Sequence, residues 1–201
     1  MFLIRGIVFS HEAVRDWEAK LTPALAEELR RRRRHRIGPS CYIDETCIKV
    51  QGPCRYLYRA IDRDGVLVDV LLSEHRNLAA AKALFRSART VTGVVPDCVT
   101  TDGHDGYPAA IQSELSGKVL HRTSAYLNNR LEQDHRGIKD RYRSMRGFNS
   151  IASARRSCRT FNEVRNLLRV RSLQYHHVPA DRRRLRYLRS TATILGVLEA
   201  A

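Results

Sequence analysis

Three short stretches rich in β-branched and aromatic residues dominate the first half of the chain. They cover residues 41–50, 55–61 and 66–72, and turn-forming glycine, proline and aspartate residues separate them. Runs of this length and composition are typical of strands, and connections this short join neighbouring antiparallel strands. The pattern therefore predicts a three-stranded antiparallel meander.

Helical and strand-like segments alternate after the meander. An alanine-rich stretch predicts a helix over residues 77–89, and the apolar run 96–102 predicts a fourth strand. A short helix at 108–115 and a fifth strand at 118–122 follow, and helices dominate thereafter. This order is that of the ribonuclease-H-like (retroviral-integrase-like) fold. We therefore predict an α/β catalytic core with a mixed five-stranded sheet and helices on both faces.

The segments on either side of this core differ from it in composition. The first 29 residues read as two short helical pieces, with Ser10 as an N-cap and Gly6 in a tight turn. A run of basic residues then predicts a flexible linker. The predicted units are a partial helix-turn-helix (1–29), a basic linker (30–40), the catalytic core (41–148) and basic C-terminal helices (149–201).

The chain is strongly basic, with 36 Lys and Arg against 21 Asp and Glu and a formal net charge of +15. An excess of this size predicts a polyanionic partner, and nucleic acid is the usual one. The sequence contains no stretch as long as a membrane span and no signal peptide, which favours the cytosol and no membrane partner.

Five cysteines are spread over the chain without a Cys-x-x-Cys pair. Their spacing matches neither a zinc ribbon nor a disulfide framework. We therefore expect free thiols that fill space in or beside the strands.

One predicted helix, which begins near Tyr126, has a chemically distinctive face. Residues at offsets of zero, three, four and seven share one side of a helix, and here they are Glu132, His135, Arg136 and Lys139. A carboxylate followed by a row of cations suits a metal-assisted reaction on a phosphodiester. The alternative is a solvated face held by ion pairs between residues four apart.

Two further acids occupy strand positions that are unusual for a carboxylate. Asp44 lies within the first predicted strand, where a carboxylate is costly unless it is paired or metal-bound. Asp102 ends the fourth strand, at the edge where open α/β sheets place their active sites. In the ribonuclease-H-like order, these strands and the helix of Glu132 pack side by side. The three acids are therefore predicted to converge on two divalent cations.

Each of these acids also has a purely structural interpretation. Asp44 would be a strand-edge residue and Asp102 a turn cap, while Glu132 would form an ion pair with Arg136. Their joint placement on three adjoining elements of a basic chain favours the catalytic interpretation.

Neighbouring acids are set aside on geometric grounds. Glu45 points to the opposite face of its strand, and Asp134 points away on the helix. Asp105, in the loop after the fourth strand, stays an outside candidate.

Several groups of residues, spread over nearly the whole chain, form a series of motifs. They are Asp44-Glu-Thr with Lys49-Val, Tyr56-Leu-Tyr-Arg-Ala-Ile-Asp62, Ser73-Glu-His-Arg-Asn-Leu-Ala-Ala-Ala-Lys82, Thr101-Asp102 with Tyr107-Pro108, Tyr126-Leu-Asn-Asn-Arg-Leu-Glu-Gln-Asp-His-Arg-Gly-Ile-Lys139, and Met145-Arg-Gly-Phe148 with Ser153-Ala154-Arg155. In this order the motifs resemble those of DDE transposases of the insertion-sequence-six family.

The resemblance implies Mg²⁺-dependent DNA strand cleavage, and then strand transfer by the freed 3′-hydroxyl, at the terminal inverted repeats of an insertion sequence. It implies that the catalytic residues are Asp44, Asp102 and Glu132, and that they hold two Mg²⁺ ions, for which Mn²⁺ is expected to substitute. The expected partners are double-stranded DNA, as element ends and target, and further copies of the chain in a homo-oligomer. The expected location is the cytoplasm of a bacterium or archaeon, in association with the nucleoid.

The resemblance and the charge pattern also imply a set of DNA contacts. Lys139 would lie near the chemistry, and other polar residues of its helix would support it. The basic run and the first helix would contribute arginines. The DNA-contacting residues that we predict are Asn129, His135, Arg136, Lys139, Arg141, Arg143, Arg15, Arg31, Arg32 and Arg33.

Members of the family have further helices before the position of Gly6, so we expect the chain to be truncated at its N-terminus. That expectation favours an alternative function, a truncated and catalytically inactive DNA-binding regulator of transposition. A ribonuclease-H-like nuclease that cuts without joining is a third hypothesis. A structural basic protein, which needs no buried carboxylates, is the fourth.

Overall fold

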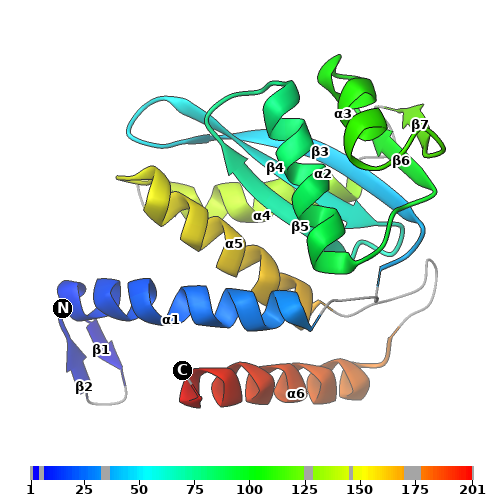
Figure 1. Cartoon of the computed structure of the whole chain (residues 1–201). Coiled ribbons are helices and arrows are strands. Elements are labelled where there is room, and N and C mark those ends of the chain that lie inside the picture. The colour runs from blue at the N-terminus through cyan, green and yellow to red at the C-terminus, as the bar shows by residue number, and fades with distance from the viewer. Residues whose placement is uncertain are drawn as a thin grey trace.

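The computed structural model describes residues 2–4, 7–32, 37–124, 129–144, 147–169 and 178–200. At its centre lies a five-stranded sheet, shown in Figure 1. Its strands are β3 (Ser40–Lys49), β4 (Cys54–Asp62), β5 (Leu67–Ser73), β6 (Cys98–Thr101) and β7 (Leu120–Thr123). Their order across the sheet is β5-β4-β3-β6-β7.

The direction of the strands confirms the predicted mixed sheet. Strands β3, β4 and β5 form the antiparallel meander, whereas β6 and β7 run parallel to β3. The pairing of β3 with β6 covers only Ser40 to Tyr42, although β3 itself continues to Lys49. Beyond Tyr42, the central strand is therefore paired with β4 alone.

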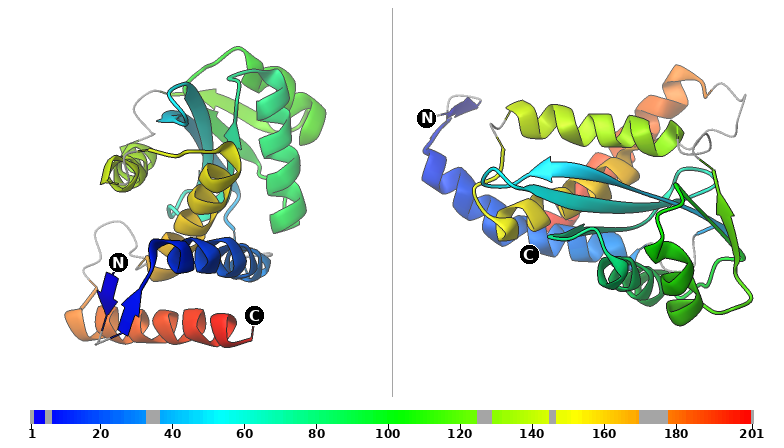
Figure 2. Two further views of the ribbon diagram at one scale, coloured as in Figure 1. Left: turned by 90° about the vertical axis from the view of Figure 1, so that its left-hand side faces the viewer. Right: turned by 90° about the horizontal axis from the view of Figure 1, so that it is seen from above.

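Helices cover both faces of the sheet (Figures 1 and 2). Because side chains alternate between the faces of a strand, Ile43 and Ile48 belong to different cores. Ile43 packs with residues of the first pair of helices, and Ile48 packs with residues of the second pair. The first pair is α2 (Leu78–Thr92) and α3 (Gly106–Glu114), and the second is α4 (Asn129–Ser144) and α5 (Ile151–Leu168).

Local sequence explains where α2 begins and ends. The Asn77 side chain accepts a hydrogen bond of 3.0 Å from the Ala80 N–H, which caps the first turn. Gly93 ends the helix with φ at 67°, a left-handed conformation that glycine adopts without a steric penalty. The helix is therefore longer than the predicted 77–89, because this glycine, and not the last periodic apolar residue, ends it.

The segment after α4 is tied to the far end of β3. Val50 and Phe148 form a parallel β-bridge, and the Gln51 N–H donates to the Phe148 carbonyl at 2.9 Å. The Phe148 ring stacks with Tyr142 of α4, with 6.4 Å between the ring centroids. These contacts hold the end of α4 beside the β3–β4 hairpin.

Two long helices, α1 (His11–Arg31) and α6 (Ala180–Glu199), lie side by side next to α5 (Figures 1 and 2). Leu25, Leu29 and Val197 form the buried centre of their contact. Arg30 joins α1 to the sheet, because its guanidinium lies 3.0 Å from the buried Asp69 carboxylate of β5. No helix in the described parts of the chain has the length and hydropathy to cross a bilayer.

The predicted pair of short helices in residues 1–29 is wrong. Strands β1 (Phe2–Ile4) and β2 (Ile7–Phe9) pair antiparallel, and one continuous helix, α1, follows. Apolar runs of three residues, separated by only two residues in sequence, favour a hairpin over a helix. The Ser10 cap is confirmed, since its hydroxyl oxygen accepts a 3.0 Å hydrogen bond from the Ala13 N–H. A helix-turn-helix is thus not found in the described part of this segment.

The basic linker also begins later than predicted. Arg30 and Arg31 belong to the last turn of α1, and Arg32 caps it. The apolar positions Leu25 and Leu29 extend the buried face of the helix to this point. Residues 33–36 lie outside the described residues.

The expectation that all five cysteines are free is wrong for two of them. Cys47 and Cys54 form a disulfide, with their Cα atoms 5.6 Å apart. The register pairs Lys49 with Cys54, so the two cysteines lie diagonally across the β3–β4 hairpin. Sequence spacing alone does not reveal that register. Cys41, Cys98 and Cys158 are free, as expected.

Replacement of a core leucine tests the packing of α2 on the sheet. Leu84 is 0% exposed, so Leu84→Ala is expected to lower the free energy of unfolding by about 2–5 kcal/mol. Leu78→Ala, in the same helix but at a position that is 38% exposed, is the matched control and should cost less than about 1 kcal/mol. Urea denaturation measures both, and equal losses would contradict the assigned face.

Candidate active site

Asp44 lies in the part of β3 where the strand has lost its pairing with β6. Its side chain points to the face that α4 covers. One carboxylate oxygen accepts a 2.9 Å hydrogen bond from the Glu45 N–H. The other oxygen lies 3.6 Å from Nδ1 of His135, a buried residue of α4. The carboxylate is thus half-buried between the sheet and α4.

Asp102 follows the last residue of β6 and lies beside Asp44. The register pairs Tyr42 with Thr100, so two residues further on, the same two strands bring both aspartates to one level. The Asp102 carboxylate accepts a 3.2 Å hydrogen bond from the His104 N–H. Gly103 makes this turn with φ at 95°, and a Cβ atom there would come within 2.7 Å of Thr123.

Three carboxylates meet at this point. One oxygen each from Asp44, Glu45 and Asp102 lies within 4.8 Å of the other two. Glu45, which was set aside because it points to the opposite face of its strand, does point there and nevertheless reaches the other two carboxylates. Since β3 has no partner strand on its β6 side beyond Tyr42, side chains from both of its faces can meet around that open edge. The sequence signal for Glu45 was its position directly after Asp44, in a strand that lies beside the end of β6.

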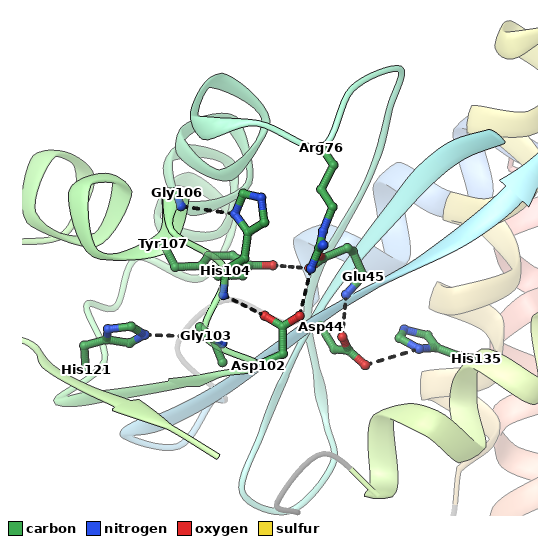
Figure 3. A network of polar contacts seen from close by, with 11 residues as sticks. Asp44, Glu45, Arg76, Asp102, Gly103, His104, Gly106, Tyr107, His121 and His135 are labelled. Carbon is green, nitrogen blue, oxygen red and sulfur yellow. Dashed lines mark hydrogen bonds and ion pairs between the residues drawn. The ribbon is translucent and has the colours of Figure 1, made fainter. Parts of the chain in front are cut away.

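Glu45 is held by two partners on the side of α2 and α3. It accepts a hydrogen bond from Nε of Arg76 and a second, of 2.5 Å, from the Tyr107 hydroxyl. A second nitrogen of the Arg76 guanidinium, Nη2, donates to Asp102 at 2.9 Å. Figure 3 shows the resulting chain of contacts, in which Arg76 lies between the two carboxylates.

Burial and the charges of this network shift the pKa values of residues in it and beside it. Burial, followed by the charge of Glu45, raises the pKa of Tyr107 well above its ordinary value. The same two causes raise the pKa of Tyr58 to about 12. Burial acts to lower the pKa of Arg76, but its hydrogen bond to Glu45 and the negative charges of Glu45 and Asp102 outweigh that effect and raise it. Tyr107 is therefore a neutral donor and Arg76 a permanent cation.

Comparison with known proteins identifies the family. Residues 38–171 match the family model of a DDE domain. The transposase for insertion sequence-like element IS431mec of Staphylococcus aureus (strain Mu50) is 35% identical over 141 residues, which are 68% of this chain and 62% of that protein. The chain belongs to the DDE transposases of the insertion-sequence-six family.

Two further comparisons agree with this membership. The transposase for insertion sequence element IS257 in transposon Tn4003 of Staphylococcus aureus shows the same 35% identity over 141 residues. The chain spans 62% of the length of these relatives. A chain of the simian T-cell lymphotropic virus intasome in complex with PP2A regulatory subunit B56 gamma has a TM-score of 0.50 at 14% identity, over 74% of this chain and 58% of that chain. That likeness confirms the ribonuclease-H-like, integrase-like fold.

The third predicted acid, Glu132, lies in α4, and its side chain lies outside the described residues. Leu131, His135 and Ile138 form the buried face of the helix. Residue 132 precedes His135 by three positions, and helical spacing predicts the same side of α4 for both. The structure therefore brings Asp44 and Asp102 together and leaves the reach of Glu132 as a prediction.

The predicted DNA contacts divide between two helices, α4 and α1. On α4, Arg136 and Arg143 are exposed, whereas Lys139 is half-buried. Arg141 packs over the Phe161 ring, 5.2 Å from its centroid. His135 is buried beside Asp44, which makes it a neighbour of the acids. The Asn129 side chain lies outside the described residues.

The arginines predicted to contact DNA near the N-terminus lie on or next to α1. Arg15 is exposed. Arg31 and Arg32 both form ion pairs with Glu28, at 2.9 Å and 2.8 Å. Arg33 lies outside the described residues.

The site contains one histidine whose titration should affect stability. His121 Nε2 lies 2.9 Å from the Thr101 hydroxyl, at the end of β6. Burial lowers the pKa of His121 below its ordinary value of about 6.5. As the pH falls below that value, the unfolded chain therefore binds the proton more readily than the folded chain does.

We accordingly expect the protein to lose stability relative to His121→Gln as the pH falls from about 7 to about 5. The contribution of neutral His121 to stability is fully present above its ordinary pKa. It is lost as the pH falls through the lowered pKa of the folded chain. Urea denaturation of both proteins at several pH values measures the difference. A difference that does not vary with pH would show that His121 titrates alike in both states.

Proposed function

We propose that the DDE domain catalyses DNA strand cleavage and strand transfer at the terminal inverted repeats of an insertion sequence. Asp44, Asp102 and Glu132 are the proposed catalytic residues. The observation that carries the proposal is the convergence of the first two, from adjacent parallel strands, within 4.8 Å at the open edge of β3. Membership of the DDE transposases supports the same assignment.

The donor set fits a divalent cation with a preference for oxygen ligands. Carboxylates gathered this closely repel one another, and Arg76 pairs with only two of the three. Mg²⁺ favours such hard ligands while it keeps water for the substrate. We propose that Asp44, Asp102 and Glu132 hold two Mg²⁺ ions, for which Mn²⁺ substitutes. Bound there, the cations would polarise the phosphodiester and neutralise the charge that develops on the departing oxygen.

Residues of the chain itself supply the remaining functions. His135 would orient Asp44 from α4, because its ring nitrogen faces one carboxylate oxygen. Exposed cations of α4, among them Arg136 and Arg143, would hold DNA phosphates next to the acids. The net charge of +15 supports double-stranded DNA, as element ends and target, as the partner.

The setting of the reaction follows from its substrates. Two element ends must be held together, so we propose that the active form is a homo-oligomer. The proposed location is the bacterial or archaeal cytoplasm, in association with the nucleoid, because the substrate is found there.

The two strand acids can be tested with substitutions that keep their shape. Asp44→Asn and Asp102→Asn are each expected to lower strand transfer into a target plasmid by about 100-fold or more, because several kcal/mol of charge stabilisation are lost. The assay uses the purified chain, a labelled element-end duplex and Mg²⁺. Asp105→Asn is the matched control, since this exposed acid lies three residues beyond Asp102 and should change little.

The products separate the competing functions. Joined products that both variants lose support the transposase. Cleaved but unjoined DNA would favour a nuclease, and binding without cleavage in all four proteins would favour the regulator of transposition. Either of these last results would overturn the proposal.

The helix acid is tested by a pair of substitutions on α4. Glu132→Gln is expected to abolish cleavage but to leave duplex binding within about twofold, because it removes a metal ligand and no phosphate contact. Asp134→Asn is the control, at a position about 200° further round the helix. Gel-shift and cleavage assays on one preparation measure both effects. Equal cleavage by the two variants would exclude Glu132 as the third acid.

A further inference from the structure

We propose that Arg76 is a positioning residue for Asp102. We also propose that its positive charge lowers the affinity of the carboxylates for a divalent cation. The part that concerns strand transfer rests on the proposed function. The part that concerns cation binding depends only on the described carboxylates.

The backbone around Arg76 is fixed on both sides. It lies between Ser73, the last residue of β5, and Asn77, the cap of α2. The Ser73 hydroxyl accepts a 3.2 Å hydrogen bond from the His75 N–H, and Asn77 accepts from Ala80 at 3.0 Å. A short connection anchored in this way presents the Arg76 side chain from a defined position.

The guanidinium uses two neighbouring nitrogens for two different carboxylates. Nε donates to Glu45, and Nη2 donates to Asp102 at 2.9 Å. Such a planar fork fixes the angle between its partners, which the single ammonium group of a lysine does not. The side chain of Arg76 is 39% exposed, so the contact with Asp102 lies at the rim of the site, where it can yield.

The other end of the network lies in the core. Glu45, whose side chain is 4% exposed, also accepts the hydrogen bond of the buried Tyr107 hydroxyl. Tyr107 in turn packs against Phe85 of α2, with 6.4 Å between the ring centroids. A continuous chain of contacts thus runs from the core through Glu45 and Arg76 to Asp102 (Figure 3).

Two opposite effects follow from the removal of Arg76. The group of carboxylates becomes more negative, so a divalent cation should bind more tightly. Asp102 loses the donor that orients one of its oxygens and keeps the His104 N–H on the other, so the reaction should become slower. A residue that merely stabilised the fold would weaken both properties when replaced.

The test compares Mn²⁺ binding and strand transfer in the full chain. Arg76→Gln is expected to tighten Mn²⁺ binding by about 3- to 10-fold in a titration followed by electron paramagnetic resonance. Strand transfer at saturating Mn²⁺ should fall by about 10-fold or more. Arg86→Gln is the matched control. Arg86 lies within α2 and, like Arg76, pairs with a carboxylate, but its partner is Glu114 at 2.7 Å and not one of the clustered acids.

A conservative variant keeps the test decisive if Arg76→Gln does not fold. Arg76→Lys retains the charge without the fork, so Mn²⁺ affinity should match that of the unaltered protein while strand transfer still falls. Strand transfer at the unaltered rate in Arg76→Lys would overturn the positioning role. Mn²⁺ binding in Arg76→Gln that is no tighter than in Arg86→Gln would overturn the proposed effect of the positive charge of Arg76 on affinity.

Asp102→Asn distinguishes failure of this inference from failure of the proposed function. If the unaltered protein and Asp102→Asn bind Mn²⁺ equally well, the metal assignment itself is wrong. If Asp102→Asn binds Mn²⁺ more weakly but Arg76→Gln gains nothing, the site stands and the role of Arg76 does not.

Discussion

The candidate active site depends on the unequal lengths of two neighbouring strands. β6 ends at Thr101, and its pairing with β3 stops at Tyr42, whereas β3 continues to Lys49. A sheet paired on both sides would keep the two faces of β3 apart, since successive side chains point in opposite directions. The open edge removes that barrier at Asp44 and Glu45. It also leaves the turn after β6 free to bring Asp102 alongside them.

Gathering negative charge at such an edge is unfavourable, and much of the surrounding structure offsets it. The groups that face these carboxylates come from different layers: the Arg76 cation from the connection before α2, the Tyr107 hydroxyl from α3 and the His135 ring from α4. The helices α2, α3 and α4 are packed on the sheet through their apolar faces, and the connection that carries Arg76 leads directly into α2. The packing of the helices and the electrostatics of the acids are therefore linked. A loss of packing in either helical layer would change the charge balance at Asp44 or Glu45.

Local patterns predicted the meander, the order of elements and the positions of Asp44 and Asp102, because these follow from strand composition and strand ends. What they missed depends on pairing between distant segments. The reach of Glu45 follows from where β6 ends beside β3, and the disulfide follows from the register of a hairpin. Arg76 lies in a connection without periodicity, so no pattern drew attention to it. The error at the N-terminus has another cause, since apolar runs of three residues fit a strand as well as a helical turn.

The bridge between Val50 and Phe148 has a consequence for the placement of α4. A helix packed on a sheet by apolar side chains alone can slide along it, and a slip of one turn would move every residue by about 5.4 Å. Hydrogen bonds from Gln51 to the segment after α4 prevent that slip. These hydrogen bonds lie roughly 20 Å along β3 from Asp44. The position of α4 along the sheet, and with it the place of His135 beside Asp44, is thus fixed partly by residues remote from the three carboxylates.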